Sequence, residues 1–220
     1  AHPGIPRIGF TGSVGTGKAV LRTAAEEVKV VTLELGGKNP LLVLPDVPPE
    51  QAAKLALIGM NLQRTAGQSC GSTSRVFVHR SRRPEFVEAL AQLFDELVVG
   101  DPSSEGTDVG PLAFAGHRDR VVDYIEIGVG EGATLRAGGA EPPAGLERGY
   151  YVRPTILDGV EDGMRVAQEE IFGPVVSVLE WEREDDLVER ANALKLGLTA
   201  NVSTNDLGAA LRLSRALEAG

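Results

Sequence analysis

Residues 30–44 read VVTLELGGKNPLLVL, which is two apolar β-type runs joined by a glycine-rich turn. Runs of Val and Leu bounded by Gly and Pro predict strands, here at 30–35 and 41–44. The turn at 36–40 is the best candidate for a domain boundary, because Gly and Pro interrupt regular structure. The stretch therefore predicts that one unit of the chain ends at residue 36 and that a second begins at residue 37.

Outward from this stretch, short apolar runs alternate with longer helical patterns. Further strands are predicted at 7–11, 75–79, 151–157, 175–181 and 198–203. Helices are predicted at 16–28, 49–63, 83–99, 116–129, 185–194 and 207–219. Clusters of Gly, Pro and Ser predict loops at 101–111 and 138–149. The alternation of strands and helices predicts an α/β fold with a largely parallel sheet.

The composition is that of a globular protein: the 220 residues are 42% hydrophobic and 24% charged. The formal net charge of -9 disfavours a nucleic-acid partner, whose backbone is also negative. No window approaches the roughly 20 apolar residues that span a bilayer, so no membrane partner is expected. The sequence begins without a Met, and we expect it to be part of a longer protein. The dispersed histidines predict no metal site; they are His2, His79 and His117.

Cys70 is the only cysteine, so no internal disulfide can form and a reducing, cytoplasmic location is expected. Its neighbours are small and polar, since residues 65–75 read TAGQSCGSTSR. Gly67 and Gly71 leave space around the sulfur and bring backbone N–H groups near it, as a nucleophile that forms an oxyanion requires. The alternative is a cysteine that packs as a small hydrophobic residue.

A glycine-rich turn between a predicted strand and a predicted helix occupies residues 8–18, IGFTGSVGTGK. Such turns bind phosphate through backbone N–H groups at the start of the helix. Gly12-x4-Gly17-Lys18 matches most of a P-loop, but Ala19 stands where a hydroxyl should bind Mg²⁺. The glycine spacing also differs from the dinucleotide fingerprint G-x-G-x-x-G. A P-loop-like nucleotide-binding module and a plain glycine turn are therefore open alternatives for this segment.

Glu34 is a carboxylate within an apolar predicted strand, followed by two glycines. Burying an unpaired carboxylate costs several kcal/mol or raises its pKa, and a raised pKa suits a general base. The alternative is that Glu34 faces solvent or pairs with a Lys or Arg.

Taken together, these segments resemble the aldehyde dehydrogenase superfamily over nearly the whole chain. The motifs that carry the resemblance are FTGS at 10–13 with Gly17, LELGGK at 33–38, GQSC at 67–70 and EEIFGPV at 169–175. The late stretches GLTA at 197–200 and TND at 204–206 are similar to the family too. The resemblance implies that residues 1–36 are the C-terminal remnant of a Rossmann-like NAD(P)-binding domain. Residues 37–220 would then be the catalytic domain, truncated at its C-terminus.

The resemblance also implies the chemistry. Cys70 would attack an aldehyde to form a thiohemiacetal, whose hydride passes to NAD or NADP and leaves a thioester. Glu34 would activate the water that hydrolyses this thioester to a carboxylic acid, and its presence favours hydrolysis over transfer to coenzyme A. The cofactor-binding residues implied by the resemblance are Gly12, Ser13, Gly17, Leu35, Gly36, Glu170 and Phe172.

The family chain is longer than this one, and its oxyanion-hole asparagine lies upstream of the motifs present here. The 220 residues alone are therefore expected to bind the cofactor weakly and to oxidise aldehydes poorly. The resemblance implies a homo-oligomer for the full-length protein. A catalytically inactive homologue is the remaining alternative.

Overall fold

A computed structural model describes residues 2–220, and it forms two sheets. In chain order the elements are β1 (Arg7–Thr11), α1 (Val14–Ala25), β2 (Val30–Glu34), β3 (Pro40–Val43), α2 (Pro49–Gly59), α3 (Leu62–Thr65), β4 (Arg75–His79), α4 (Arg83–Asp95), α5 (Ala115–Gly130), β5 (Thr134–Ala137), β6 (Thr155–Asp158), α6 (Arg165–Gln168), β7 (Val175–Trp181), α7 (Glu184–Asn192), β8 (Asn201–Ser203) and α8 (Leu207–Ala216). Among these helices, none combines the length and the apolar character needed to cross a bilayer.

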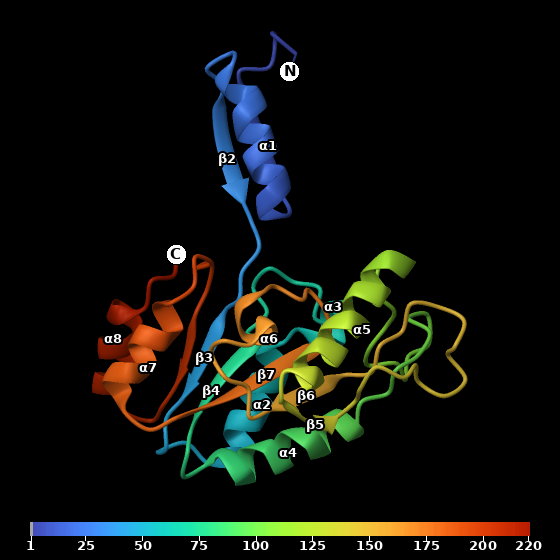
Figure 1. Cartoon of the computed structure of the whole chain (residues 1–220), viewed down its shortest axis with the longest axis vertical. Helices are drawn as coiled ribbons and strands as arrows, with labels where there is room; N and C mark the ends of the chain where they lie inside the picture. The colour runs from blue at the N-terminus through green and yellow to red at the C-terminus, as the bar shows by residue number, and fades with distance from the viewer. Residues whose placement is uncertain (1) are drawn as a thin grey trace.

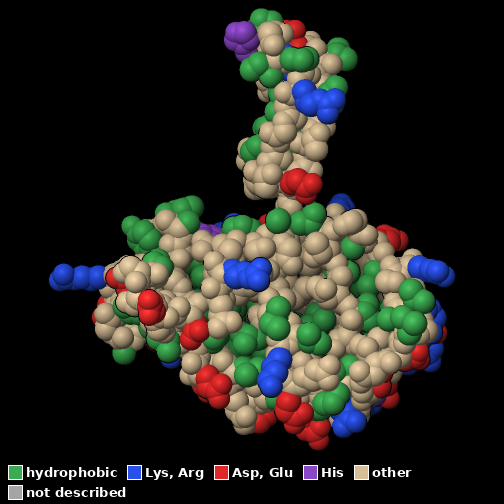
Figure 2. Space-filling view, turned by 180° about the vertical axis from the view of Figure 1, so that it is seen from behind, with side chains coloured by type: hydrophobic (Ala, Val, Ile, Leu, Met, Phe, Trp, Pro, Cys, Tyr) green, Lys and Arg blue, Asp and Glu red, His purple; other side chains and the backbone are tan. Residues whose placement is uncertain are grey.

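The first sheet is small and stands apart from the rest of the chain. Strands β1 and β2 pair in parallel, with Thr11 opposite Glu34, and α1 packs on both. Figure 1 shows this unit projecting from the larger body, and Figure 2 shows the same narrow connection from behind. Residues 35–39 carry the chain from β2 into β3 and so join the two sheets.

The second sheet has six strands in the order β5-β6-β7-β4-β3-β8. All its neighbouring strands are parallel except β5 and β6, which are antiparallel. The central strands are buried along most of their length, as expected for parallel strands covered on both faces. The α/β class with a largely parallel sheet, predicted from the alternating pattern, is confirmed.

Helices cover the second sheet and complete its core. Helix α4 packs on α2 and also contacts β4, β5 and β6, while α5 packs on α6 and β6. Helix α7 contacts the inner strand β7, and α8 contacts the edge strand β8 (Figure 1). The core residues with the largest fully buried apolar side chains include Phe77 on β4 and Phe86 and Leu90 on α4.

Some predicted elements differ from those observed. The helix predicted at 49–63 is broken into α2 and α3, because Asn61 adopts a left-handed conformation with φ 55°. The strand predicted at 151–157 is only β6, and the strand predicted at 198–203 is only β8. The pattern missed β5 and α6, which are four residues long and too short to show a period.

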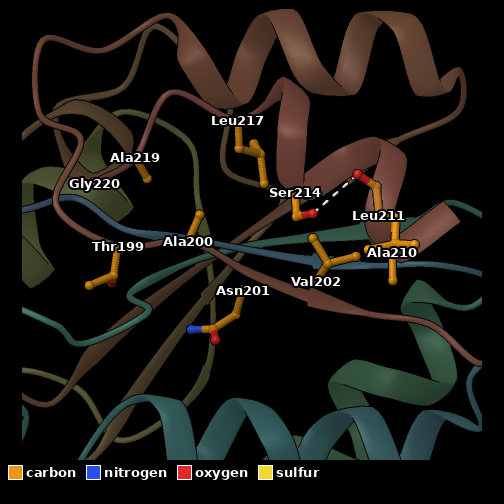
Figure 3. Close-up of a pocket in the computed structure, with 10 residues that line it drawn as sticks. All are labelled: Thr199, Ala200, Asn201, Val202, Ala210, Leu211, Ser214, Leu217, Ala219 and Gly220. Atoms are coloured by element: carbon orange, nitrogen blue, oxygen red, sulfur yellow. Dashed lines mark hydrogen bonds between the residues drawn. The ribbon is translucent and has the colours of Figure 1, made fainter. Parts of the chain in front are cut away.

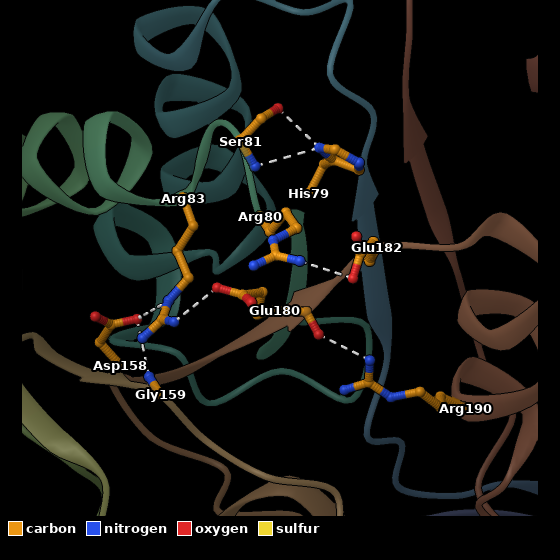
Figure 4. Close-up of polar contacts among 9 residues, drawn as sticks. All are labelled: His79, Arg80, Ser81, Arg83, Asp158, Gly159, Glu180, Glu182 and Arg190. Atoms are coloured by element: carbon orange, nitrogen blue, oxygen red, sulfur yellow. Dashed lines mark hydrogen bonds and ion pairs between the residues drawn. The ribbon is translucent and has the colours of Figure 1, made fainter.

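Charged side chains tie the ends of β6, β7 and α4 together (Figure 4). The Arg83 Nε atom donates to Asp158 Oδ1 at 2.8 Å, and its Nη1 atom donates to Glu180 Oε2 at 3.0 Å. These hydrogen bonds, the Asp158 bond first, raise the pKa of Arg83. On the same side, Arg190 Nη1 donates to the Glu180 backbone carbonyl at 2.7 Å. The network fixes the start of α4 against the sheet.

The aromatic ring of Phe77 provides a test of the core. Phe77 is 0% exposed, and the guanidinium carbons of Arg75 and Arg190 lie 5.1 and 5.2 Å from its ring centroid. We expect Phe77→Ala to lower the free energy of unfolding by about 3–5 kcal/mol, measured by urea denaturation, because a cavity replaces the ring. Phe114→Ala is the control, since Phe114 is 60% exposed. Equal losses in the two variants would contradict the assignment of Phe77 to the core.

Candidate active site

A pocket of about 540 Å³ lies where the small unit meets the large one. Its lining consists of Thr11, Gly12, Ser13, Glu34, Leu35, Gly36, Thr65, Gln68, Ser69, Cys70, Ala113, Phe114, His117, Arg120, Glu170 and Phe172. The structure thus brings together every predicted site residue except Gly17. That glycine lies in α1, where a Cβ atom would approach Leu35 Cδ2 to 2.7 Å. Gly17 therefore gives Leu35 room beside the helix rather than forming part of the pocket wall.

A second pocket, of about 460 Å³, lies between β8 and α8 (Figure 3). Its lining comes from residues 199–202 and from the last part of the chain, where Ser214 Oγ donates to the Leu211 carbonyl at 3.2 Å. None of the predicted site residues lines it. The candidate active site is therefore the pocket that contains Cys70.

Helix α1 begins at the edge of this pocket. Ser13 is its N-cap, and the Ser13 Oγ atom accepts a hydrogen bond from the Thr16 N–H at 3.3 Å. The remaining N–H groups of the first turn and the helix dipole favour an anion at this position. Lys18 and Ala19 are exposed and lie outside the pocket lining, which counts against the P-loop alternative.

Glu34 ends β2 opposite Thr11 and is exposed at the rim of the pocket. Burial of this carboxylate, one of the two alternatives weighed for Glu34, is therefore not observed. Exposure alternates along β2: Val31 and Leu33 are partly buried, whereas Glu34 is exposed. Only one face of the two-stranded sheet is therefore covered. The alternative weighed for Glu34, exposure to solvent, is the one observed.

Cys70 is half-buried in the loop between α3 and β4, and hydrogen bonds from Asn39 hold this loop in place. The buried Asn39 side chain donates from Nδ2 to the carbonyls of Cys70 at 2.7 Å and Ser72 at 3.0 Å. Its Oδ1 atom accepts from the Thr199 N–H at 3.0 Å. All the hydrogen-bonding groups of this amide are directed to backbone, so Asn39 fixes the loop relative to β3.

Gln68, which belongs to the same loop, forms two further hydrogen bonds that fix it. Its Nε2 atom donates to the Thr65 carbonyl at 2.9 Å, and its Oε1 atom accepts from the Ala113 N–H at 3.0 Å. Gly67 adopts φ +73°, and a Cβ atom there would overlap the Gly173 carbonyl. The cysteine loop therefore touches the backbone of the segment that follows Phe172.

Glu170 faces the turn that leads into β3. Its Oε1 atom accepts from the Gly37 N–H at 3.1 Å, and a Cβ atom at Gly36 would overlap its carboxylate. Burial raises the pKa of Glu170, while the Gly37 hydrogen bond and the positive charges of Arg120 and Lys38 oppose the rise. The second carboxylate oxygen, Oε2, is not bonded to any side chain or N–H group within residues 2–220, so it can accept a hydrogen bond from a ligand.

Phe172 has a left-handed backbone, with φ 62°, which is strained for an aromatic residue. His117 holds this conformation, because its Nε2 atom lies 2.8 Å from the Phe172 carbonyl and donates to it. Phe172 is 37% exposed and lines the pocket. Arg120 supports the same segment by donating from Nη2 to the Glu170 carbonyl at 2.6 Å.

Glu169 anchors the start of this segment. Tyr124 Oη donates to its Oε2 atom at 2.5 Å, and Arg165 donates to both carboxylate oxygens at 2.9 and 3.0 Å. The Arg165 and Tyr124 hydrogen bonds, in that order, lower the pKa of Glu169 to about 2. Segment 169–173 is thus held by α5, by α6 and by the turn at residue 37.

Several of these residues were not predicted from the sequence. They are Asn39, Gln68, His117, Arg120 and Tyr124. Gln68 lies within the GQSC motif and Asn39 within the turn at 36–40, so these segments are the one signal that pointed to them. Within the described part of the chain, no group of three or more His, Cys, Asp or Glu side chains is placed to hold a metal ion.

The chain belongs to the aldehyde dehydrogenase family, whose pattern it matches over residues 1–220. Betaine aldehyde dehydrogenase of Rhizobium etli is 45% identical over 219 residues, covering 100% of this chain and 45% of the relative. Betaine aldehyde dehydrogenase of Sinorhizobium fredii is 46% identical over 219 residues, with the same coverage. The chain therefore spans less than half the length of these curated relatives.

Solved structures of the family superpose on the whole chain. The NAD⁺ complex of aldehyde dehydrogenase from Bacillus cereus has a TM-score of 0.94 and 42% identity, covering 100% of this chain and 44% of that one. A cysteine-to-alanine mutant of aldehyde dehydrogenase C from Pseudomonas syringae, complexed with NAD⁺ and octanal, has a TM-score of 0.96 and 40% identity, covering 100% and 45%. The α/β fold is thus shared with enzymes of this family.

Truncation of the Asn39 side chain tests whether its hydrogen bonds hold the cysteine loop. We expect Asn39→Ala to lower the free energy of unfolding by about 2–3 kcal/mol, because it leaves buried carbonyls of the cysteine loop without donors. Amide hydrogen exchange in residues 69–73 should become faster in the same variant. Asn201→Ala, at an exposed position on β8, is the control and should change neither measurement. Unchanged exchange in the loop of Asn39→Ala would contradict this role.

The Arg165 contact predicts a pH dependence. Glu169 has a lowered pKa in the folded chain, so its contribution to stability is present above its ordinary pKa of 4.5 and is lost as pH falls toward 2. Arg165→Ala should therefore lower the unfolding free energy above that pH, and the difference from wild type should close in acid. We expect less than about 1 kcal/mol, because both side chains are partly exposed.

The control is Arg183→Ala, which removes an exposed pair with Asp186. The difference in unfolding free energy between Arg183→Ala and wild type should not narrow comparably as the pH falls from about 4.5 toward 2. A difference between Arg165→Ala and wild type that stays constant down to the acid limit would contradict the assignment.

Proposed function

We propose that this chain carries the reacting groups of an NAD(P)⁺-dependent aldehyde dehydrogenase that oxidises an aldehyde to a carboxylic acid. The observation that carries the proposal is one pocket lined by Cys70, Glu34, Glu170, Phe172 and the first residues of α1. Membership of the aldehyde dehydrogenase family supports it. The NAD⁺ complexes of structural relatives support the choice of cofactor.

The proposal also assigns two parts of the chain to different domains. Residues 1–36 would be the C-terminal part of a cofactor domain, and residues 37–220 would be the catalytic domain. Two separate sheets, with residues 35–39 carrying the chain from one to the other, support this boundary. The pocket lies at that junction, so each domain would supply part of its wall.

The residues present fit a nicotinamide dinucleotide. The start of α1 and Ser13 would bind a phosphate of the cofactor, since helix N-termini favour anions. Glu170 would accept hydrogen bonds from ribose hydroxyls through the carboxylate oxygen that Gly37 leaves free. Phe172 would pack beside the nicotinamide, and Leu35 and Gly36 would offer backbone groups to it. When bound, NAD(P)⁺ supplies the acceptor for the hydride of the substrate.

Cys70 would supply the nucleophile. Its thiolate attacks the aldehyde carbonyl carbon, and the carbonyl oxygen becomes the oxyanion of a thiohemiacetal. Loss of the hydride re-forms the carbonyl group and leaves an acyl thioester on Cys70. Glu34 would take a proton from water as that water attacks the thioester, which releases the carboxylic acid and restores the thiolate. The position of Glu34 at the solvent-exposed rim supports this role, because water reaches it there.

The substrate class follows from the relatives. Relatives named betaine aldehyde dehydrogenase support betaine aldehyde as the first substrate to test. A relative complexed with octanal supports an apolar aldehyde as the comparison. The exposed rings of Phe114 and Phe172 in the pocket suit either one, since aromatic faces attract quaternary ammonium groups and also pack against alkyl chains.

NADH formation in the protein as its gene encodes it tests this function. Cys70→Ala should abolish NADH formation from betaine aldehyde, because no thiohemiacetal can form. Glu34→Gln should still give a burst of about one NADH per thiol, followed by a steady state slower by about 10²–10⁴-fold. Glu27→Gln, at an exposed position beyond α1, is the control and should behave as wild type. A Cys70→Ala variant with wild-type turnover would overturn the proposed function.

A further inference from the structure

Phe172 holds a backbone conformation that its own side chain disfavours. Its φ angle is 62°, in the left-handed region, where the Cβ atom of an L-residue crowds a backbone oxygen. Such a conformation persists only where the surrounding structure imposes it, and it occurs most often at functional sites. Because Phe172 lines the pocket that contains Cys70, the contact that imposes this conformation affects the shape of the candidate site.

The main chain of Phe172 is held by one side chain. His117 Nε2 lies 2.8 Å from the Phe172 carbonyl oxygen, and within residues 2–220 no other hydrogen bond reaches the N–H or the carbonyl of this residue. The neighbouring carbonyl, that of Glu170, is bonded separately by Arg120. The orientation of a carbonyl changes with the ψ angle of its residue, so the bond from His117 restrains the backbone of Phe172 directly.

His117 is itself fixed in place. It lies in the first turn of α5 and is only 8% exposed. Its ring centroid lies 5.8 Å from that of Phe114 and 6.0 Å from that of Phe172. Because a carbonyl oxygen only accepts hydrogen bonds, the Nε2 atom must carry a proton. The contact therefore requires a side chain that reaches the carbonyl with an N–H group, which glutamine has and leucine lacks.

We propose that His117 is a positioning residue for the cofactor site: its Nε2–H group holds the left-handed backbone of Phe172 and so fixes the Phe172 side chain in the pocket wall before a cofactor binds. The inference rests on the proposed function, in which Phe172 packs beside the nicotinamide. Side-chain direction depends on backbone conformation, so a relaxed residue 172 would carry its ring elsewhere. Cofactor binding would then have to restore the strained conformation, which lowers the apparent affinity in proportion to the fraction of molecules that hold it.

A crystal structure without cofactor tests the contact itself, in the protein as its gene encodes it. In His117→Leu, Phe172 should leave the left-handed region, because no donor remains to hold its carbonyl. In His117→Gln, the amide should restore the hydrogen bond, and the φ angle of Phe172 should stay near 62°. An unmoved Phe172 in His117→Leu would overturn the inference. If His117→Leu fails to fold, His117→Asn takes its place, since its shorter amide cannot reach the same carbonyl.

NAD⁺ affinity, measured by calorimetry on the same proteins, tests the consequence for the cofactor. His117→Leu should weaken NAD⁺ binding by about three- to tenfold, which is the range of one hydrogen bond, and His117→Gln should bind as wild type does. His79→Leu is the matched control and should also bind as wild type does. His79 is a partly buried histidine at the end of β4, outside the pocket lining.

A second substitution, Phe172→Ala, separates positioning from packing. It removes the ring that His117 places, so adding His117→Leu to Phe172→Ala should weaken NAD⁺ binding no further. A packing role for His117 does not pass through that ring and would cost the same in both backgrounds. An equal loss of affinity from His117→Leu with and without the Phe172 ring would therefore overturn the inference.

The same measurements distinguish the inference from the proposed function. Weaker NAD⁺ binding in Phe172→Ala, together with wild-type binding in His117→Leu, would overturn the role of His117 and leave the proposed function standing. Wild-type binding in Phe172→Ala would overturn the cofactor contact assigned to Phe172, and the inference with it.

Discussion

The hydrogen bonds of the buried Asn39 amide are the constraint on which the rest of the site depends. Asn39 lies where the chain leaves the small sheet and enters β3, and its side chain bonds only to backbone groups. Those groups belong to the cysteine loop and to the segment before β8, so one side chain joins parts of the chain that are far apart in sequence. The adjoining Gly37 N–H fixes Glu170 from the same turn. A five-residue crossing between two sheets thereby positions both the thiol of Cys70 and the carboxylate of Glu170.

Much of the fold is predictable from local pattern. The strands predicted at 7–11, 75–79 and 175–181 coincide with β1, β4 and β7, because these are continuous runs of β-forming residues with clear ends. The failures have specific causes. Strand β5 reads TLRA and is mostly exposed, so it lacks an apolar signature, and the helix through Asn61 breaks at a left-handed residue that helical periodicity does not reveal.

The candidate site is predictable only in part, and for a physical reason. Cys70 was singled out by its small, polar neighbours and Glu170 by the family resemblance of its segment, and the chain brings both to one pocket. The side chains that hold them, such as His117 and Tyr124, act across many residues and leave no local pattern. The apolar strand around Glu34 left burial and solvent exposure both open, and Glu34 is exposed because a sheet of two strands leaves one face open. Burial depends on what covers a strand, which local sequence does not encode.

The contact of Gly67 with the backbone of Gly173 sets a length scale for the pocket. With no side chain between them, the loop that carries the thiol and the segment that carries Glu170 and Phe172 are separated only by the thickness of two polypeptide backbones. Neither can approach the other more closely, and neither can be moved apart without opening that contact. The spacing between these two segments is therefore fixed by main-chain atoms, and side-chain variation elsewhere in the pocket can alter its shape without altering that spacing.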